Sequence, residues 1–163
     1  MLILGIDPGL QKTGWGLIET QNNSLSYRDS GLVKTQTSLP LAARLSIIDE
    51  GLARVVHDYK PDVAVVEETF VNRNPASALK LGMARGIAMV VPARYGLDVF
   101  EYAANAIKKT VVGTGHASKD QIAVMVRTLL PKSGRVTADE ADALAMAICH
   151  AHHKRSAYKL TKL

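Results

Sequence analysis

The sequence has a single cysteine and no long apolar run, and these absences exclude several classes of protein. Cys149 stands alone, so no intramolecular disulfide can form. No charged segment followed by a long apolar run opens the chain, as a secretory signal would require. The longest apolar stretches fall far short of the roughly 20 residues that a membrane span needs. We therefore expect a cytoplasmic protein with no membrane partner.

Acidic residues are scarce over the middle of the chain. The formal net charge is +5, and between Thr69 and Ala138 ten basic residues accompany only three acids. This imbalance fits a polyanionic partner. It fits equally well a surface whose lysines and arginines only keep the protein in solution. Charge alone therefore does not decide between binding and solubility.

Length and composition suit one compact domain. A chain of 163 residues that is 47% hydrophobic can fill a core without a disulfide or a structural metal. No linker or internal repeat interrupts the pattern. We expect a single domain over residues 1–155, followed over residues 156–163 by a basic, flexible tail.

The first third of the chain predicts an antiparallel meander and then a helix. Three apolar runs joined by short turns predict strands over Leu2–Ile6, Gly14–Glu19 and Leu25–Lys34. Apolar residues then recur at intervals of three and four from Pro40 until Lys60-Pro61, which predicts a helix between these two prolines.

Strands and helices alternate over the rest of the chain. The patterns predict a strand covered on both faces, a helix, a strand and a short helix, in the order Val63–Val66, Ala76–Val91, Leu97–Tyr102 and Asn105–Val112. Two further helices begin at capping boxes, one at Ser118 with Gln121 and one at Thr137 with Glu140. This order predicts an α/β protein of the RNase H-like fold, with a mixed five-stranded sheet flanked by helices.

Acidic residues end two of the predicted strands. Asp7 ends the first strand in the sequence Asp-Pro-Gly, where its side chain could equally cap the turn. Glu67 and Glu68 end the buried strand, where a solvated strand end is the plain alternative. Because side chains alternate along a strand, only one of these two glutamates can face Asp7.

The last helix carries a second pair of acids. Asp139 and Asp142 are three residues apart in its first turns and therefore project from neighbouring positions. The helix dipole and the capping box account for Glu140, which lies between them. They account less well for Asp142, because the helix around it is alanine-rich and apolar. An aspartate buried there needs a counter-charge.

The predicted fold brings these acids together. If the first and fourth strands are neighbours, Asp7 and Glu67 end side by side, and a helix across the sheet can add Asp139 and Asp142. Such a cluster would raise carboxyl pKa values unless a divalent cation neutralised it. Mg²⁺ suits oxygen ligands of this kind, and two ions could activate water and stabilise the leaving oxygen of a phosphodiester. Mn²⁺ could substitute.

Several motifs, in their joint order and spacing, resemble the RuvC family of Holliday junction resolvases over nearly the whole chain, up to about His153. The matching stretches are Gly5-Ile6-Asp7-Pro8-Gly9, Thr13-Gly14-Trp15-Gly16, Glu67 with Phe70, Asn72 and Asn74, Ala84-Arg85-Gly86, Lys108 with Val112-Gly113-Thr114-Gly115, Ala117-Ser118-Lys119, and Ala138-Asp139-Glu140-Ala141-Asp142-Ala143-Leu144-Ala145. Each motif alone is weak, and only the set is specific.

The resemblance implies a function and its catalytic residues. It implies a homodimeric crossover junction endodeoxyribonuclease that makes paired symmetric nicks in four-way DNA junctions during recombination and repair. Metal-activated water would leave 5′-phosphate and 3′-hydroxyl ends, and RuvA and RuvB would be partners. Glu67 is selected over Glu68 only because the family more often has an uncharged residue at the second position. The implied metal-binding acids are Asp7, Glu67, Asp139 and Asp142, and the implied catalytic lysines are Lys108 and Lys119.

The resemblance also implies contacts with DNA. Phe70 matches an aromatic residue that stacks on bases at the junction centre, although a core position is the alternative. The other expected contacts are Asn72, Arg73, Asn74, Lys80, Arg85, Lys108 and Lys119. Solvated positions at helix ends remain an alternative for the two catalytic lysines. Met83 and Ala104 depart from the family, where Gln and Pro are expected.

Three other functions remain possible from the sequence. An actin-like or sugar-kinase ATP-binding fold shares the Gly-Ile-Asp hairpin but requires two lobes, and 163 residues hold only one. A non-catalytic junction-binding protein would keep the basic surface. An RNase H-like nuclease acting on RNA:DNA hybrids would keep the acids.

Overall fold

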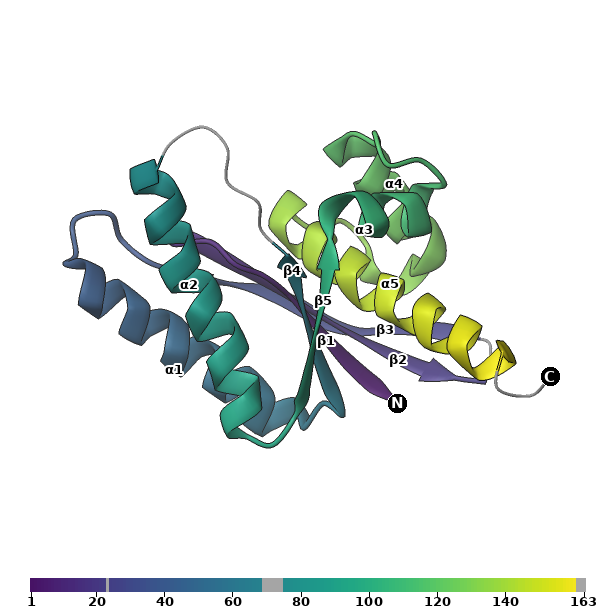
Figure 1. The fold of residues 1–163 in the computed structure, drawn as a ribbon, viewed down its shortest axis with the longest axis horizontal. Helices are drawn as coiled ribbons and strands as arrows, with labels where there is room; N and C mark the ends of the chain where they lie inside the picture. The colour runs from purple at the N-terminus through teal and green to yellow at the C-terminus, as the bar shows by residue number, and fades with distance from the viewer. Residues whose placement is uncertain (23, 69–74, 161–163) are drawn as a thin grey trace.

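The computed structural model describes residues 1–22, 24–68 and 75–160, with side chains as far as residue 153. Figure 1 shows the arrangement of its elements. These are β1 (Leu2–Asp7), β2 (Lys12–Gln21), β3 (Ser24–Lys34), α1 (Leu41–Tyr59), β4 (Val63–Glu68), α2 (Pro75–Arg94), β5 (Asp98–Ala103), α3 (Ala104–Val112), α4 (Lys119–Leu129), the 3-10 helix η1 (Pro131–Ser133) and α5 (Ala138–Leu160).

The strands form one mixed sheet in the order β3-β2-β1-β4-β5. The first three strands pair antiparallel, as expected of a meander, while β4 pairs parallel with both β1 and β5. The parallel pairing places the ends of β1 and β4 at the same edge. The predicted α/β fold with a mixed five-stranded sheet is confirmed.

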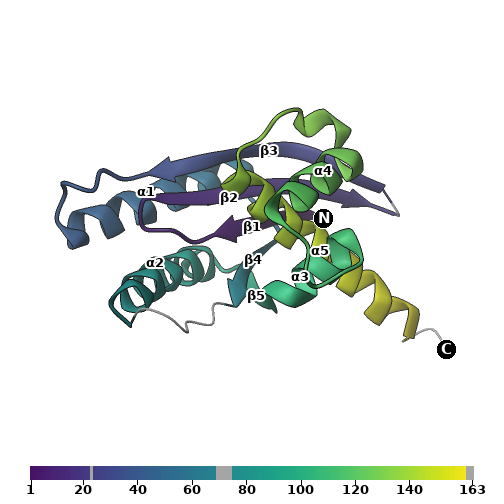
Figure 2. The same ribbon diagram turned by 90° about the horizontal axis from the view of Figure 1, so that it is seen from above.

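Helices cover both faces of the sheet and enclose two cores (Figures 1 and 2). One core packs α3, α4 and α5 against Ile3 of β1 and Val65 of β4. The other packs α1 and α2 against Leu4 and Ile6 of β1 and Val66 of β4. Because side chains alternate, β1 and β4 each contribute to both cores, and for β4 this was predicted from the apolar run Val63–Val66.

Helix α5 lies unusually close to the sheet because glycines face it. A Cβ atom on Gly5 of β1 would overlap the carbonyl oxygen of Ala143, and one on Gly14 of β2 would overlap that of Asp139. Gly14 is also the residue that pairs with Asp7 in the sheet. The absence of side chains at these positions therefore brings the first turns of α5 onto the end of β1.

Helix α2 continues three residues past its predicted end at Val91. Pro92 lies in the last turn and is buried, and its carbonyl oxygen accepts hydrogen bonds from the backbone N–H groups of Tyr95 (3.1 Å) and Leu97 (3.1 Å). A proline at this position does not end the helix at once, because the bond that it removes belongs to the final turn. The short η1 helix was not predicted.

Among the described residues, α2 is also long and apolar enough, by length and composition alone, to cross a membrane. The helix lies instead against the sheet, where Ala84, Ala88 and Val91 are buried in the second core. Ile87 and Met89 are partly buried against the same core, whereas Leu79, Met83 and Val90 are exposed.

Candidate active site

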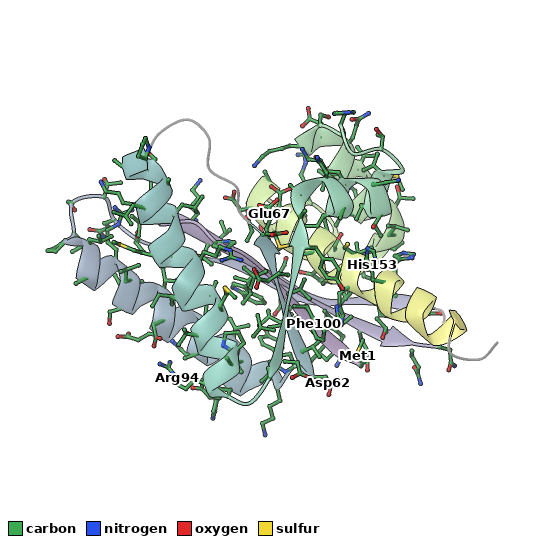
Figure 3. All side chains as sticks on the ribbon, in the orientation of Figure 1. Met1, Asp62, Glu67, Arg94, Phe100 and His153 are labelled. Carbon is green, nitrogen blue, oxygen red and sulfur yellow. The ribbon has the colours of Figure 1, made fainter. Side chains whose placement is uncertain are left out.

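Asp7 and Glu67 stand at the adjoining ends of β1 and β4. In the parallel register Ile6 pairs with Val66. Asp7 and Glu67 are the next residues of the two strands and therefore lie side by side. Ile6 and Val66 both point into the core beneath α1 and α2, and alternation turns the next residue of each strand toward α5. Figure 3 shows Glu67 beside the first turns of α5. Glu68 is exposed on the other face.

The turn after Asp7 does not depend on the Asp7 side chain. Thr13 is fully buried, and its hydroxyl donates a hydrogen bond to the carbonyl oxygen of Gly9 at 2.8 Å. The backbone N–H of Gly9 donates in return to the Thr13 hydroxyl at 3.4 Å. Within the described residues the Asp7 carboxylate accepts no hydrogen bond. The turn-capping alternative for Asp7 therefore fails, and its carboxylate is available for another role.

Helix α5 brings Asp142 to the same place. The side chain of Asp142 is 24% exposed, and its Oδ2 lies 3.1 Å from Nζ of Lys119. This ion pair is the counter-charge that a partly buried aspartate in an apolar helix requires. Asp139 lies one turn nearer the start of α5 and is also partly buried.

Asp7, Glu67 and Asp142 line one pocket of about 200 Å³. Its charged residues come from β1, β4, α3, α4 and α5, and apolar side chains from the same helices surround them. The lining residues are Asp7, Glu67, Ala104, Ile107, Lys108, Lys119, Ile122, Asp142, Ala145 and Met146. Asp139 is not among them, although its charge acts on Asp7. Ala104, where the family resemblance led us to expect proline, forms part of the wall.

Burial and mutual repulsion weaken the acidity of the two strand-end carboxyls. Burial is the main cause that raises the pKa of Asp7 from 3.8 to about 7, and repulsion by Asp142, Glu67 and Asp139 adds to it. Burial and then repulsion by Asp142 raise the pKa of Glu67, while Lys108 and Lys119 oppose this effect. The two lysines do not fully balance the acids, so the pocket favours an additional cation.

The side chains fit a hard divalent cation by their chemistry. Carboxylate oxygens are the ligands that Mg²⁺ and Mn²⁺ prefer, and the pKa of Asp7 is raised by burial first and then by repulsion from the neighbouring acids. Within the described residues, however, no three His, Cys, Asp or Glu side chains converge closely enough to hold one ion. The ammonium group of Lys119 occupies the cation position beside Asp142 instead.

Local structure places both lysines at the pocket. Lys119 is the first residue of α4, where the helix dipole disfavours a cation. The capping box predicted at this helix is confirmed: the Ser118 N–H donates to Oε1 of Gln121 at 2.8 Å, and the Gln121 N–H donates to the Ser118 hydroxyl at 3.3 Å. Asp142 stabilises the charge of Lys119 and raises its pKa. Lys108 lies on α3, within the pocket wall.

The other expected DNA contacts lie elsewhere. Arg85 donates from Nε to the backbone carbonyl oxygen of Glu67 at 3.0 Å and pairs with Glu101. It therefore supports the end of β4, a role that sequence reasoning missed because only its charge was considered. Lys80 is exposed on α2 and does not line the pocket. The remaining expected contacts, Phe70, Asn72, Arg73 and Asn74, lie outside the described residues.

Comparison with known proteins identifies the family. The family model described as crossover junction endodeoxyribonuclease RuvC matches residues 3–150. The chain belongs to the RuvC family. The RuvC protein of Afipia carboxidovorans is 57% identical over 161 residues, covering 99% of this chain and 94% of that protein. The resemblance seen in the motifs is thereby confirmed.

Two solved RuvC structures from Thermus thermophilus share the fold. One is 32% identical with a TM-score of 0.86, covering 96% of this chain and 97% of that one. The other, in complex with a Holliday junction substrate, is 33% identical with a TM-score of 0.89, covering 96% of both chains. The predicted RNase H-like arrangement is thus that of the RuvC family.

Proposed function

We propose that this protein resolves four-way DNA junctions by metal-dependent hydrolysis of phosphodiester bonds, as an endonuclease of its family. The observation that carries the proposal is the pocket in which Asp7, Glu67 and Asp142 meet Lys108 and Lys119. A cluster of acids suits metal ions, and lysines beside it suit a phosphate. A purely structural strand end would require neither the acids nor the lysines.

The four acids would hold the metal. Asp7, Glu67 and Asp142 line the pocket, and Asp139 lies within electrostatic reach of Asp7. Two Mg²⁺ ions, or Mn²⁺ in their place, would supply a Lewis acid that activates water and stabilises the leaving oxygen. The separate strands and helix that carry these acids keep their side chains at the pocket before substrate binds, and Arg85 supports the backbone at Glu67.

The lysines would act on the substrate. Lys119 is 70% exposed while it pairs with Asp142, so its ammonium group can exchange that partner for a phosphate oxygen. Lys108, on the pocket wall, would add a second positive charge. Positive charges placed beside the scissile phosphate stabilise the negative charge that develops on its oxygens. The products would be 5′-phosphate and 3′-hydroxyl ends.

Contacts beyond the pocket would hold the junction. Phe70, Asn72, Arg73 and Asn74 follow β4 directly in sequence, and Phe70 would stack on bases at the junction centre. Lys80 would contact the backbone of an arm. Arg85, expected to bind DNA, would act instead through its bond to Glu67, because its guanidinium is already engaged. We place the protein in the cytoplasm, with RuvA and RuvB as partners.

The substrate test compares a synthetic four-way junction with a matched linear duplex and an RNA:DNA hybrid, each with Mg²⁺ or with a chelator. We expect paired symmetric nicks in the junction alone, and none when the divalent ion is removed. Cleavage of the hybrid would favour the related RNase H-like function. Binding of the junction without cleavage in either Mg²⁺ or Mn²⁺ would contradict the proposal and favour a non-catalytic junction-binding protein.

Paired nicks require two active sites, and helix α2 offers a surface for a homodimer. Leu79, Met83 and Val90 are 64%, 37% and 55% exposed. Their spacing places them on one face of the helix. Gly86 lies on the same face, and a Cβ atom there would meet nothing within 4 Å. A partner helix can therefore approach closely and bury an apolar stripe that is otherwise in contact with water.

Charge on this stripe should dissociate the dimer. Leu79→Glu places two buried, unpaired carboxylates in a symmetric interface, which costs several kcal/mol. We expect a dissociation constant raised about 100-fold or more. Sedimentation equilibrium should show a mass near the 17.6 kDa of one chain rather than twice that value.

The matched control is Val124→Glu, because Val124 is 55% exposed on α4, away from the stripe. This variant should remain dimeric. If Leu79→Glu is also dimeric at low micromolar concentration, the dimer uses another surface.

A further inference from the structure

Glu140 joins the first turn of α5 to the edge strand β3. The Ser30 hydroxyl donates a hydrogen bond to Oε1 of Glu140 at 2.9 Å. The backbone N–H and the hydroxyl of Thr137 donate to Oε2 of the same carboxylate at 2.9 Å and 2.6 Å. The predicted capping box at this helix is therefore present, but its glutamate also forms a bond to a strand 110 positions away in the sequence.

The Ser30 end of this contact is itself held in place. Its hydroxyl lies 3.0 Å from the hydroxyl of Tyr27, and its backbone N–H donates to Oδ1 of Asp29 at 2.8 Å. The Asp29 carboxylate in turn accepts a hydrogen bond from the hydroxyl of Tyr59 at the end of α1. The first turn of α5 is thus tied through Glu140 to residues of both β3 and α1.

This tie bears on the pocket because of where Glu140 lies in the helix. It directly follows Asp139 and precedes Asp142 by two positions. A rotation or shift of the first turn of α5 would therefore move both aspartates relative to Asp7 and Glu67, which are carried by the sheet. A capping box satisfies only the helix end. The bond to Ser30 adds a fixed connection between helix and sheet.

We propose that Glu140, through its hydrogen bond to Ser30, is a positioning residue that sets Asp139 and Asp142 against Asp7. The inference rests on the proposed function, since it concerns the geometry of the same acids. Glu140 does not line the pocket, so it would act through the helix and not directly on an ion or the substrate. Its carboxylate is used by Ser30 and Thr137, so its contribution depends on hydrogen-bond geometry and not on its negative charge.

The first comparison is between Glu140→Ala and Glu140→Gln. The alanine variant loses every side-chain contact, and displaced acids should lower kcat on a four-way junction about 10- to 100-fold. The glutamine variant can accept from the Thr137 N–H and donate to Ser30, so it should remain within about threefold of wild type. If glutamine is as harmful as alanine, the charge itself is required and the positioning role is wrong.

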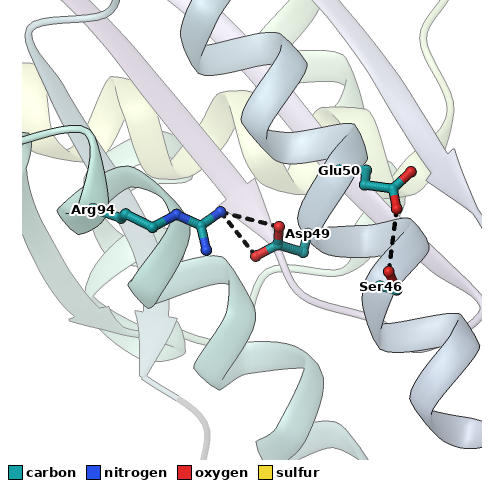
Figure 4. A network of polar contacts seen from close by, with 4 residues as sticks. All are labelled: Ser46, Asp49, Glu50 and Arg94. Carbon is teal, nitrogen blue, oxygen red and sulfur yellow. Dashed lines mark hydrogen bonds and ion pairs between the residues drawn. The ribbon is translucent and has the colours of Figure 1, made fainter.

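The second comparison tests the contact with the strand. Ser30→Ala should lower kcat by a similar factor, and Ser30→Ala combined with Glu140→Ala should be no worse than Glu140→Ala alone, because both remove one interaction. Fully additive losses would contradict the proposal. Glu50→Ala is the matched control: Glu50 accepts a hydrogen bond from the Ser46 hydroxyl at 3.2 Å on α1, outside the pocket (Figure 4). It should leave kcat unchanged.

Two measurements separate positioning from a loss of stability. Junction affinity without a divalent ion should be unchanged in Glu140→Ala, while calorimetry should show weaker Mn²⁺ binding in the absence of DNA. Assays well below the unfolding temperature should still show the lower kcat. A lower unfolding temperature with wild-type kcat and wild-type Mn²⁺ affinity would overturn the inference. A wild type that fails to cut junctions would instead contradict the proposed function and leave the Mn²⁺ comparison interpretable.

Discussion

Asp7→Asn should abolish cleavage of a four-way junction while leaving its affinity for the junction near that of wild type. Asparagine has nearly the same shape as aspartate but lacks the negative charge that holds a divalent cation. Asp7 interacts with all three other acids of the pocket, so its loss affects the whole set. We expect the single-turnover cleavage rate, measured with saturating Mg²⁺, to fall by about 10³-fold or more.

Glu68→Gln is the matched control for this experiment. It removes one carboxylate from the same edge of the sheet, but Glu68 is exposed and alternation turns it away from α5. This variant should cleave at close to the wild-type rate. A rate for Asp7→Asn above a tenth of wild type, or equal damage from Glu68→Gln, would show that the pocket is not the reaction centre.

The sequence alone does not show which of Glu67 and Glu68 faces the pocket. Along Val63–Val66 every residue is apolar, because both faces of the strand are covered. The sequence pattern therefore does not show which residues face which side of the sheet. Nothing local then says which glutamate faces α5, and only the family resemblance selected Glu67. The structure shows the orientation, because Val66 packs beneath α1 and α2 and the following residue, Glu67, must therefore face α5.

Features that depend on neighbouring residues were predictable, and those that depend on distant ones were not. Both capping boxes and the meander follow from short-range spacing, and the structure contains them. The hydrogen bond between Ser30 and Glu140 and the close approach of α5 to Gly5 join parts of the chain that no local pattern connects. Arg85 looked like a DNA contact because its partner, a backbone carbonyl oxygen, leaves no mark in the sequence.

Asp7 should also make the stability of the metal-free protein depend on pH. Its pKa rises from 3.8 to about 7 on folding, so between these values the unfolded state releases a proton that the folded state keeps. Stability from this group is therefore present below about pH 4, falls as pH rises, and is fully lost above pH 7. This difference in pKa corresponds to at most about 4 kcal/mol in the free energy of unfolding.

Asparagine cannot ionise, so Asp7→Asn should unfold at a higher urea concentration than wild type at pH 8 in the presence of a chelator, with a gain of up to about 4 kcal/mol. At pH 4 the two proteins should be nearly equal in stability.

Asp98→Asn, at the exposed start of β5, controls for the loss of one negative charge and should show no such pH-dependent gain. Adding Mg²⁺ at pH 8 should stabilise wild type and have much less effect on Asp7→Asn, because the ion binds the folded carboxylate cluster. A gain for Asp7→Asn of the same size at both pH values would mean that burial of the side chain, and not the charge of the carboxylates, limits the stability of the pocket.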